Sequence, residues 1–175
     1  GDDERARGGL ECLIGERGEV HRAGRRRVLV LARAVDRDAV DEQPGLVERD
    51  AHLIYNVCVL IGPDGKVAGK YRKCSLPRSE VEAGVAPGHE YPVFDTRFGK
   101  VGMMVCYDGF FPEVARQLTN NGAEVIAWPV WGCNPALAAA RACENHVYVI
   151  SSTYETPDRN WMLSAVWDHT GGRLA

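Results

Sequence analysis

The segment VGMMVCYDGFFPEVARQLTNNGAEVIAWPV, residues 101–130, sets the fold class through its alternation of apolar runs and one amphipathic stretch. The first run leads through Cys106 and predicts a buried strand. A helix is expected next, because Pro112 suits a first helical turn and Gly122 a helix end. A second buried strand is expected over 124–130. Strands that alternate with helices in this way predict an α/β layered fold.

The flanking sequence adds antiparallel pairs and therefore predicts a mixed sheet. Residues 52–73 contain two strand-like runs around Pro63-Asp64-Gly65, a typical turn sequence, and indicate a β-hairpin. Residues 75–92, with several Pro and Gly residues, are expected to be a loop. The buried strand that leads through Cys106 is expected over 100–108. The other expected elements are an extended piece over 92–96, a turn over 98–100, a helix over 134–146, a strand over 147–155 and the start of a hairpin over 162–175.

Residues 1–44 differ from the rest in composition. They contain nine arginines but neither lysine nor an aromatic residue. The apolar run over 25–35 is compatible with a strand or a short helix, and its periodicity does not decide between them. This composition resembles that of a peptide translated from GC-rich coding DNA in the wrong frame. It leads to the hypothesis that this lead segment results from a frame error or gene decay. We therefore expect a lead segment over 1–44 and one domain over 45–175.

The bulk composition excludes several classes of protein. With 175 residues, 45% hydrophobic and 26% charged, the chain has the balance of one globular domain. A net charge of −3 without a basic block disfavours nucleic acid as a partner. The apolar runs are too short to span a bilayer, and the polar start does not read as a secretory signal. Six loosely spaced cysteines without a CxxC pair indicate free thiols, a reducing cytoplasmic location and no zinc site.

Cys106 allows two interpretations when it is considered alone. A cysteine inside an apolar strand usually behaves as a small hydrophobic residue, and position alone favours this interpretation. A cysteine at a strand end, just before a helix, can instead become a nucleophile. Nearby helix N-termini lower a thiol pKa, and free backbone N–H groups can stabilise an oxyanion.

The wider sequence resembles the nitrilase superfamily of carbon–nitrogen hydrolases. The resemblance rests on GKYRKCSLPRSE (69–80), on residues 93–129 and on NPALAAARACENHVYVISSTYE (134–155), and it extends from about Gly45 to Ala175. It implies an α-β-β-α sandwich with mixed sheets, here incomplete at both ends. It also implies that subunits assemble into a homo-oligomer, and that the chemistry needs neither a metal nor an organic cofactor.

The resemblance also implies roles for individual residues. Cys106 matches the nucleophile of the family's Glu-Lys-Cys triad, and Lys73 matches the lysine. A lysine ammonium would favour the thiolate and the charge that develops on the substrate. The backbone N–H of Tyr107 would be a second oxyanion donor. A supporting carboxylate is expected from Glu80 or Glu82, and the distance from Lys73 favours Glu80, although either could be an exposed loop residue.

Other residues near these motifs have weaker assignments. Trp131 and Asn134 follow a strand end and could line the substrate pocket. Their alternatives are a packed aromatic residue and a helix N-cap, and for Asn134 the cap is favoured. Asp108, Glu113 and Arg116 are interpreted as supporting ion pairs and hydrogen bonds.

One part of the family pattern is absent from this sequence. The family's general base is a glutamate in a Pro-Glu pair after an N-terminal strand, and the first such pair here, at Pro112, follows Cys106. Glu48 matches a different family segment and is not assigned as the base.

Three functions follow from these observations. The first is hydrolysis of a small-molecule amide, N-carbamoyl amine or nitrile through a cysteine intermediate. The second is a catalytically impaired remnant that acts only as a binding or oligomer partner. The third is a Cys-His enzyme, for which histidines are available at 89, 146 and 169, but no cysteine-protease signature surrounds Cys106.

Overall fold

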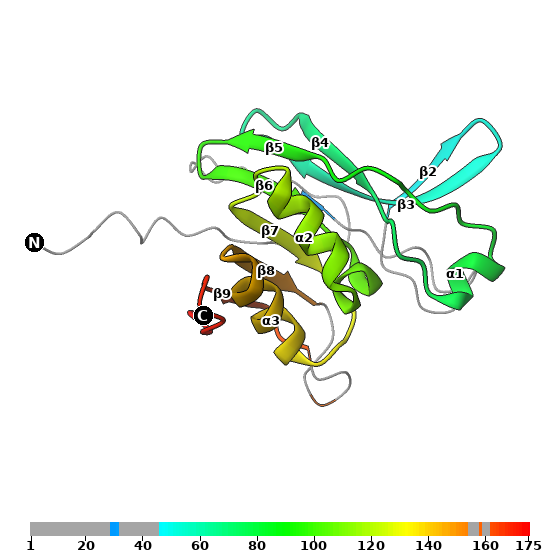
Figure 1. Cartoon of the computed structure of the whole chain (residues 1–175). Helices are drawn as coiled ribbons and strands as arrows, with labels where there is room; N and C mark the ends of the chain where they lie inside the picture. The colour runs from blue at the N-terminus through cyan, green and yellow to red at the C-terminus, as the bar shows by residue number, and fades with distance from the viewer. Residues whose placement is uncertain (1–28, 32–45, 154–157, 159–161) are drawn as a thin grey trace, which may run out of the picture.

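Two β-sheets and a layer of helices form the structure, a computed structural model in which residues 29–31, 46–153, 158 and 162–175 are described (Figure 1). The first sheet is antiparallel and is organised around β3 (Leu53–Ile61). Its other strands are β1 (Leu29–Leu31), β2 (Leu46–Asp50) and β4 (Val67–Arg72), each of which pairs with β3. The predicted hairpin over 52–73 is therefore confirmed as β3 and β4.

The lead segment contributes one described element. The run over 25–35, for which strand and helix were both possible, contains β1, whose register places Leu29 opposite Ile61. The remaining residues of 1–44, and with them the frame-error hypothesis, lie outside the described residues.

The second sheet has the order β5-β6-β7-β8-β9 and is mixed, as the sequence predicts. Its three central strands are parallel, and both outer strands pair antiparallel. Two crossover helices, α2 and α3, lie side by side across one of its faces (Figure 1). The bounds are β5 (Val93–Thr96), β6 (Gly99–Met103), α2 (Pro112–Asn120), β7 (Val125–Pro129), α3 (Pro135–Asn145), β8 (Tyr148–Ser152) and β9 (Ala165–Trp167).

The core has two parts because the side chains of β6 and β7 alternate between the faces of their sheet. Met103 packs with Leu60 and Tyr71 of the first sheet. Ile126 packs on the other face, with Leu118 of α2. The two sheets therefore face each other, with helices on the outside of the second, as expected for a nitrilase-like sandwich.

Two predictions about local structure are wrong. The strand expected over 100–108 ends at Met103, and a short 3₁₀ helix, η2, spans Cys106–Phe110. The turn depends on Gly109, since a Cβ there would lie 2.1 Å from the buried ring of Trp128. The loop expected over 75–92 contains a helix, α1 (Arg78–Glu82). Its five residues are too few to give a periodic signal.

Candidate active site

Cys106 lies at the point where the chain leaves β6 and enters η2. Its backbone φ is 45°, a conformation that residues other than glycine rarely adopt. The indole Nε1 of Trp128 donates to the Cys106 carbonyl at 3.0 Å and helps to hold this turn. Strained residues of this kind cluster at functional sites, so the backbone itself favours a functional role over the simple core interpretation.

Lys73 follows β4 directly and is buried rather than solvated. Its Nζ pairs with Oε1 of Glu80 on α1, and the two side chains are 1% and 2% exposed. Glu82 instead pairs with Arg78 on the surface. The structure therefore brings Lys73 together with Glu80, which was favoured over Glu82 as the supporting carboxylate. An ion pair with so little water access is retained only where its geometry is good or where it has a use.

Asp108 holds two segments of the chain together. Its fully buried carboxylate accepts from the Tyr71 hydroxyl at 2.8 Å and from the backbone N–H of Val105 at 2.8 Å. It also accepts from the N–H groups of Cys74 and Ser75 at 3.2 and 2.7 Å. The turn that carries Cys106 and the segment that carries Lys73 are therefore held by the same side chain, which agrees with the supporting role predicted for Asp108.

Several of these groups act on the Cys106 thiol. Burial raises the pKa of the thiol, and the ammonium of Lys73 and the backbone N–H of Trp131 oppose this by favouring the thiolate. The carboxylates of Glu80 and Asp108 raise the pKa of Cys106 further. The neutral thiol is thus the resting form near neutrality, and a base must remove its proton before Cys106 can attack.

This balance predicts a pH dependence for alkylation of Cys106. Only the thiolate reacts, so the rate with iodoacetamide should rise with pH and approach its maximum only above the ordinary cysteine pKa of about 8.5. The rate can be followed by peptide mass spectrometry, with the exposed Cys143 as the internal comparison. A Cys106 that reacts at its maximal rate by pH 6 would contradict the dominance of burial.

The two residues that were weighed as pocket residues behave differently. Asn134 is exposed, and its side chain accepts from the N–H of Ala136, so the N-cap predicted for α3 is confirmed. Trp131 lies close to Cys106 through its backbone N–H, and its carbonyl accepts from the Thr153 hydroxyl at 2.7 Å. The structure therefore places the backbone of Trp131 beside Cys106, whereas the side chain of Asn134 caps α3.

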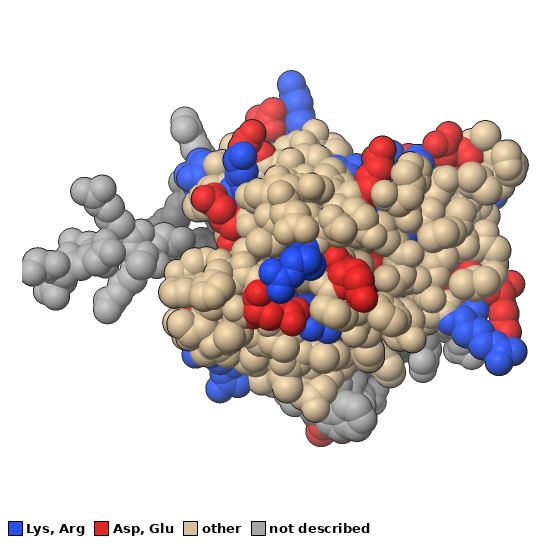
Figure 2. All heavy atoms as spheres, in the orientation of Figure 1, with Lys and Arg blue, Asp and Glu red and all other residues tan. Residues whose placement is uncertain are grey.

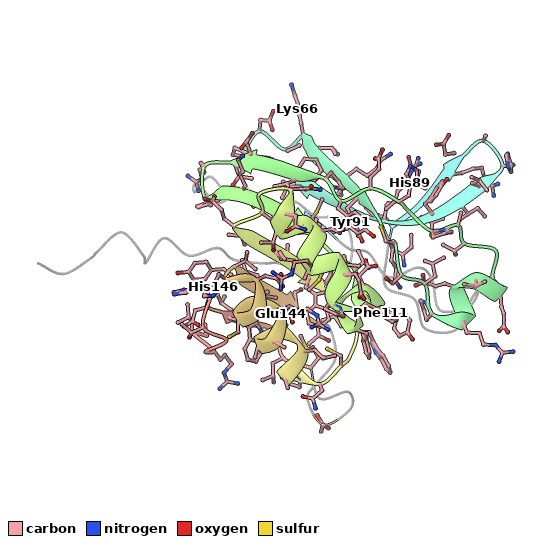
Figure 3. All side chains as sticks on the ribbon, viewed as in Figure 1. Lys66, His89, Tyr91, Phe111, Glu144 and His146 are labelled. Atoms are coloured by element: carbon pink, nitrogen blue, oxygen red, sulfur yellow. The ribbon has the colours of Figure 1, made fainter. Side chains whose placement is uncertain are left out.

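The three histidines weighed for a Cys-His enzyme all lie at the surface. His146 ends α3 in a left-handed conformation, at the opposite end of this helix from the Trp131 segment (Figure 3). Its ring lies 6.5 Å from that of His169, and both side chains are exposed, as is His89. The helix-end interpretation of His146 is confirmed.

Glu48 is occupied by surface contacts. It pairs with Lys70 and with Arg72, and hydrogen bonds from these two cations lower its pKa to about 2. A carboxylate held in this way is a poor proton acceptor, which supports leaving it unassigned. The glutamates of the lead segment, at positions 4, 11, 16, 19 and 42, lie outside the described residues.

Acidic and basic side chains are interspersed over the face in Figure 2, and Lys66 points away from the fold in Figure 3. Within the described ranges, no three potential metal ligands gather at one place. In the same part of the chain, no helix is both long and apolar enough to cross a bilayer.

Asn56 is a site residue that sequence reasoning did not identify. It lies on β3, its carbonyl accepts from the N–H of Lys73 at 2.8 Å, and its amide donates to Glu80 at 3.1 Å. The available signal was a polar residue inside the apolar run YNVCVLI, and such a residue needs partners when it is buried.

Comparison with known proteins identifies a family for this chain. The sequence profile of the Carbon-nitrogen hydrolase family matches residues 27–173. A nitrilase of Pyrococcus abyssi is 44% identical over 112 residues, which are 62% of this chain and 42% of that protein. An omega-amidase of Xenopus laevis is 34% identical over 139 residues, or 70% of this chain and 49% of the relative. The chain thus spans about half the length of the curated relatives it matches.

Solved structures show the same architecture. Nit3 of Saccharomyces cerevisiae, a member of branch 10 of the nitrilase superfamily, superposes with a TM-score of 0.67 at 28% identity. That match covers 83% of this chain and 54% of the yeast chain. An amidase of Nesterenkonia sp. gives a TM-score of 0.66 at 23% identity over 85% of this chain and 56% of its own, and supports the fold alone.

Proposed function

We propose, because this chain belongs to the carbon–nitrogen hydrolase family, that it cleaves a non-peptide carbon–nitrogen bond through a covalent intermediate on Cys106. The observation that carries the proposal is the buried ion pair of Lys73 and Glu80, which lies within electrostatic reach of the Cys106 thiol. A cation buried beside a cysteine on a strained turn is the arrangement expected of an activated nucleophile.

The chemistry assigns a role to each of these groups. The Cys106 thiol loses its proton to a base, and its sulfur forms a bond to the carbon of an amide or N-carbamoyl group. Lys73 and the backbone N–H of Tyr107 stabilise the oxyanion. The carbon–nitrogen bond then breaks, the nitrogen takes up a proton and leaves as ammonia or an amine, and a thioester remains. Water hydrolyses the thioester and returns the thiol; a nitrile would pass through a thioimidate.

Glu80 supports this reaction by holding Lys73 in place. The carboxylates recorded as acting on the Cys106 thiol are those of Glu80 and Asp108. Both are already engaged, Glu80 with Lys73 and Asp108 with its four hydrogen-bond donors. Complete turnover therefore depends on a proton acceptor outside this set. A chain without one would form the adduct and stop.

The substrate class proposed is a small molecule with an amide, N-carbamoyl or nitrile group. The relatives that this chain matches over part of their length include proteins named nitrilase and omega-amidase. A further relative, from Francisella tularensis, is named citrullinase and is 30% identical over 73% of this chain and 53% of its own length. These names span all three chemical groups. Assembly into a homo-oligomer is part of the same proposal.

Substitution of Cys106 tests its proposed role as the nucleophile. A screen of amides, N-carbamoyl amines and nitriles should give ammonia release that Cys106→Ala abolishes, whereas Cys143→Ala, at an exposed thiol, should keep the wild-type rate. Mass spectrometry of the intact chain should show an acyl adduct only when Cys106 is present. Steady release identifies a turning-over hydrolase, and a stalled adduct identifies the impaired remnant. Activity that survives Cys106→Ala would refute the mechanism.

A further inference from the structure

Asn56 contacts both members of the buried ion pair from a third element. Because β3 pairs with β4 up to Val57 and Arg72, Asn56 lies one residue beyond this register. Its carbonyl accepts from the N–H of Lys73 at 2.8 Å and extends the ladder to the lysine. Its side chain, on a residue only 6% exposed, donates through Nδ2 to Oε1 of Glu80 at 3.1 Å. One residue thus fixes the backbone of Lys73 and the carboxylate of Glu80.

The contacts of the Glu80 carboxylate are unequal. Oε1 accepts from both Lys73 and Asn56, whereas Oε2 is buried without a hydrogen-bond partner in the described ranges. With Lys73 alone, either oxygen could face the ammonium after a rotation of the carboxylate. A second donor on the same oxygen fixes the orientation. A buried acceptor without a donor costs about 1–3 kcal/mol, which is tolerated mainly where a site uses it.

We propose that Asn56 is a positioning residue, which by donating to Oε1 of Glu80 holds this oxygen on Lys73 and leaves Oε2 available as an acceptor. The effect on catalysis is indirect, because Asn56 acts through the Lys73–Glu80 pair. This inference rests on the proposed function only for the measurements of turnover.

The test compares Asn56→Asp with wild type. The kcat of each protein is measured over a range of pH, and the ratio of the two values is taken at each pH. When protonated, the introduced carboxyl can donate an O–H to Glu80 as the Asn amide does; when ionised, it cannot donate and repels Glu80. The ratio of kcat for the variant to kcat for wild type should therefore be highest at acidic pH and fall about tenfold or more as the pH rises. The ionisable groups recorded around the pair, Lys73, Glu80, Cys106 and Asp108, are present in both proteins.

Two further variants separate positioning from folding. Asn56→Leu is nearly isosteric but has no donor, and its kcat should be reduced to a similar extent at every pH. Cys58→Ala alters a fully buried residue on the same face of β3 and introduces no carboxyl group, so its ratio should stay flat across the pH range. A rise of KM without a fall in kcat for Asn56→Leu would contradict the proposal.

A second readout does not require turnover. The rate of alkylation of Cys106, measured at each pH on folded protein, should show the same falling ratio for Asn56→Asp. The added negative charge disfavours the thiolate once the introduced carboxyl ionises. If neither the ratio of kcat nor the ratio of alkylation rates changed with pH, the proposed role of Asn56 would be overturned. A wild-type chain that releases no ammonia but shows the falling alkylation ratio would refute the proposed function and leave this inference standing.

Discussion

Lys73→Met should abolish hydrolysis and should also destabilise the fold by roughly 3–5 kcal/mol, because it leaves the carboxylate of Glu80 buried without its cation. Two effects combine to remove activity. Lys73 is the cation that opposes the burial-raised pKa of Cys106, and it is the proposed donor to the oxyanion. Thermal or denaturant unfolding measures the loss of stability, and ammonia release measures the loss of hydrolysis.

A double substitution distinguishes the catalytic role from the structural one. Lys73→Met combined with Glu80→Met replaces both charges by apolar groups of similar size, a change that is often neutral or stabilising for a buried pair. The double variant should recover most of the lost stability and remain inactive. Recovery of hydrolysis together with stability would show that Lys73 acts only in folding.

Lys70→Met is the matched control for this experiment. Lys70 lies three residues earlier on β4, but its side chain is 43% exposed and pairs with Glu48 at the surface. Exposed ion pairs contribute about 0–1 kcal/mol, so this variant should keep both its stability and its activity. An equal loss in both variants would mean that removal of either lysine from this segment is harmful, and would contradict a special role of Lys73.

The sequence predicts the strands, the crossover helices and the mixed sheet because these elements carry local signals. Pro112 and Asn134 mark where α2 and α3 begin, and the Pro-Asp-Gly turn joins β3 to β4. The strand end at Met103 was not predicted, because an apolar run does not show where a backbone takes a positive φ. The left-handed turn at Cys106 depends on the later Trp128 and on Gly109, which are contacts that only the folded chain creates.

The site residues that belong to a sequence motif could be predicted, whereas those brought to the site only by packing of distant segments could not. The motif resemblance singled out Cys106, Lys73 and Glu80, and the structure places Lys73 against Glu80 and within electrostatic reach of Cys106. Their roles in chemistry stay predictions. Asn56 carries no local signal of its partners, since Glu80 is 24 residues away along the chain. A choice such as Glu80 over Glu82 is resolved only by burial, because both lie in α1 but on different faces.

Asp108→Ala should be the other severe substitution, with an expected loss of about 3–5 kcal/mol in the free energy of unfolding. It leaves four donors without their acceptor, and each buried donor left unpaired costs about 1–3 kcal/mol. The total is smaller than the sum, because the partly buried N–H groups of Cys74 and Ser75 can regain water. The Tyr71 hydroxyl and the Val105 N–H cannot do so as readily, since both are buried.

Asp108→Asn separates the hydrogen bonds of this residue from its charge. The amide keeps one acceptor oxygen, which can serve Ser75 and Cys74, but its NH₂ group faces the N–H of Val105, and two donors repel. Because the Asp108 carboxylate raises the pKa of Cys106, loss of its charge alone would speed alkylation of the thiol. Displacement of the Lys73 segment would slow both alkylation and hydrolysis. We expect the second result, with Asp95→Asn on the exposed side of β5 as the unaffected control. Faster alkylation with undiminished hydrolysis would mean that the carboxylate of Asp108 does not hold Lys73 against Cys106.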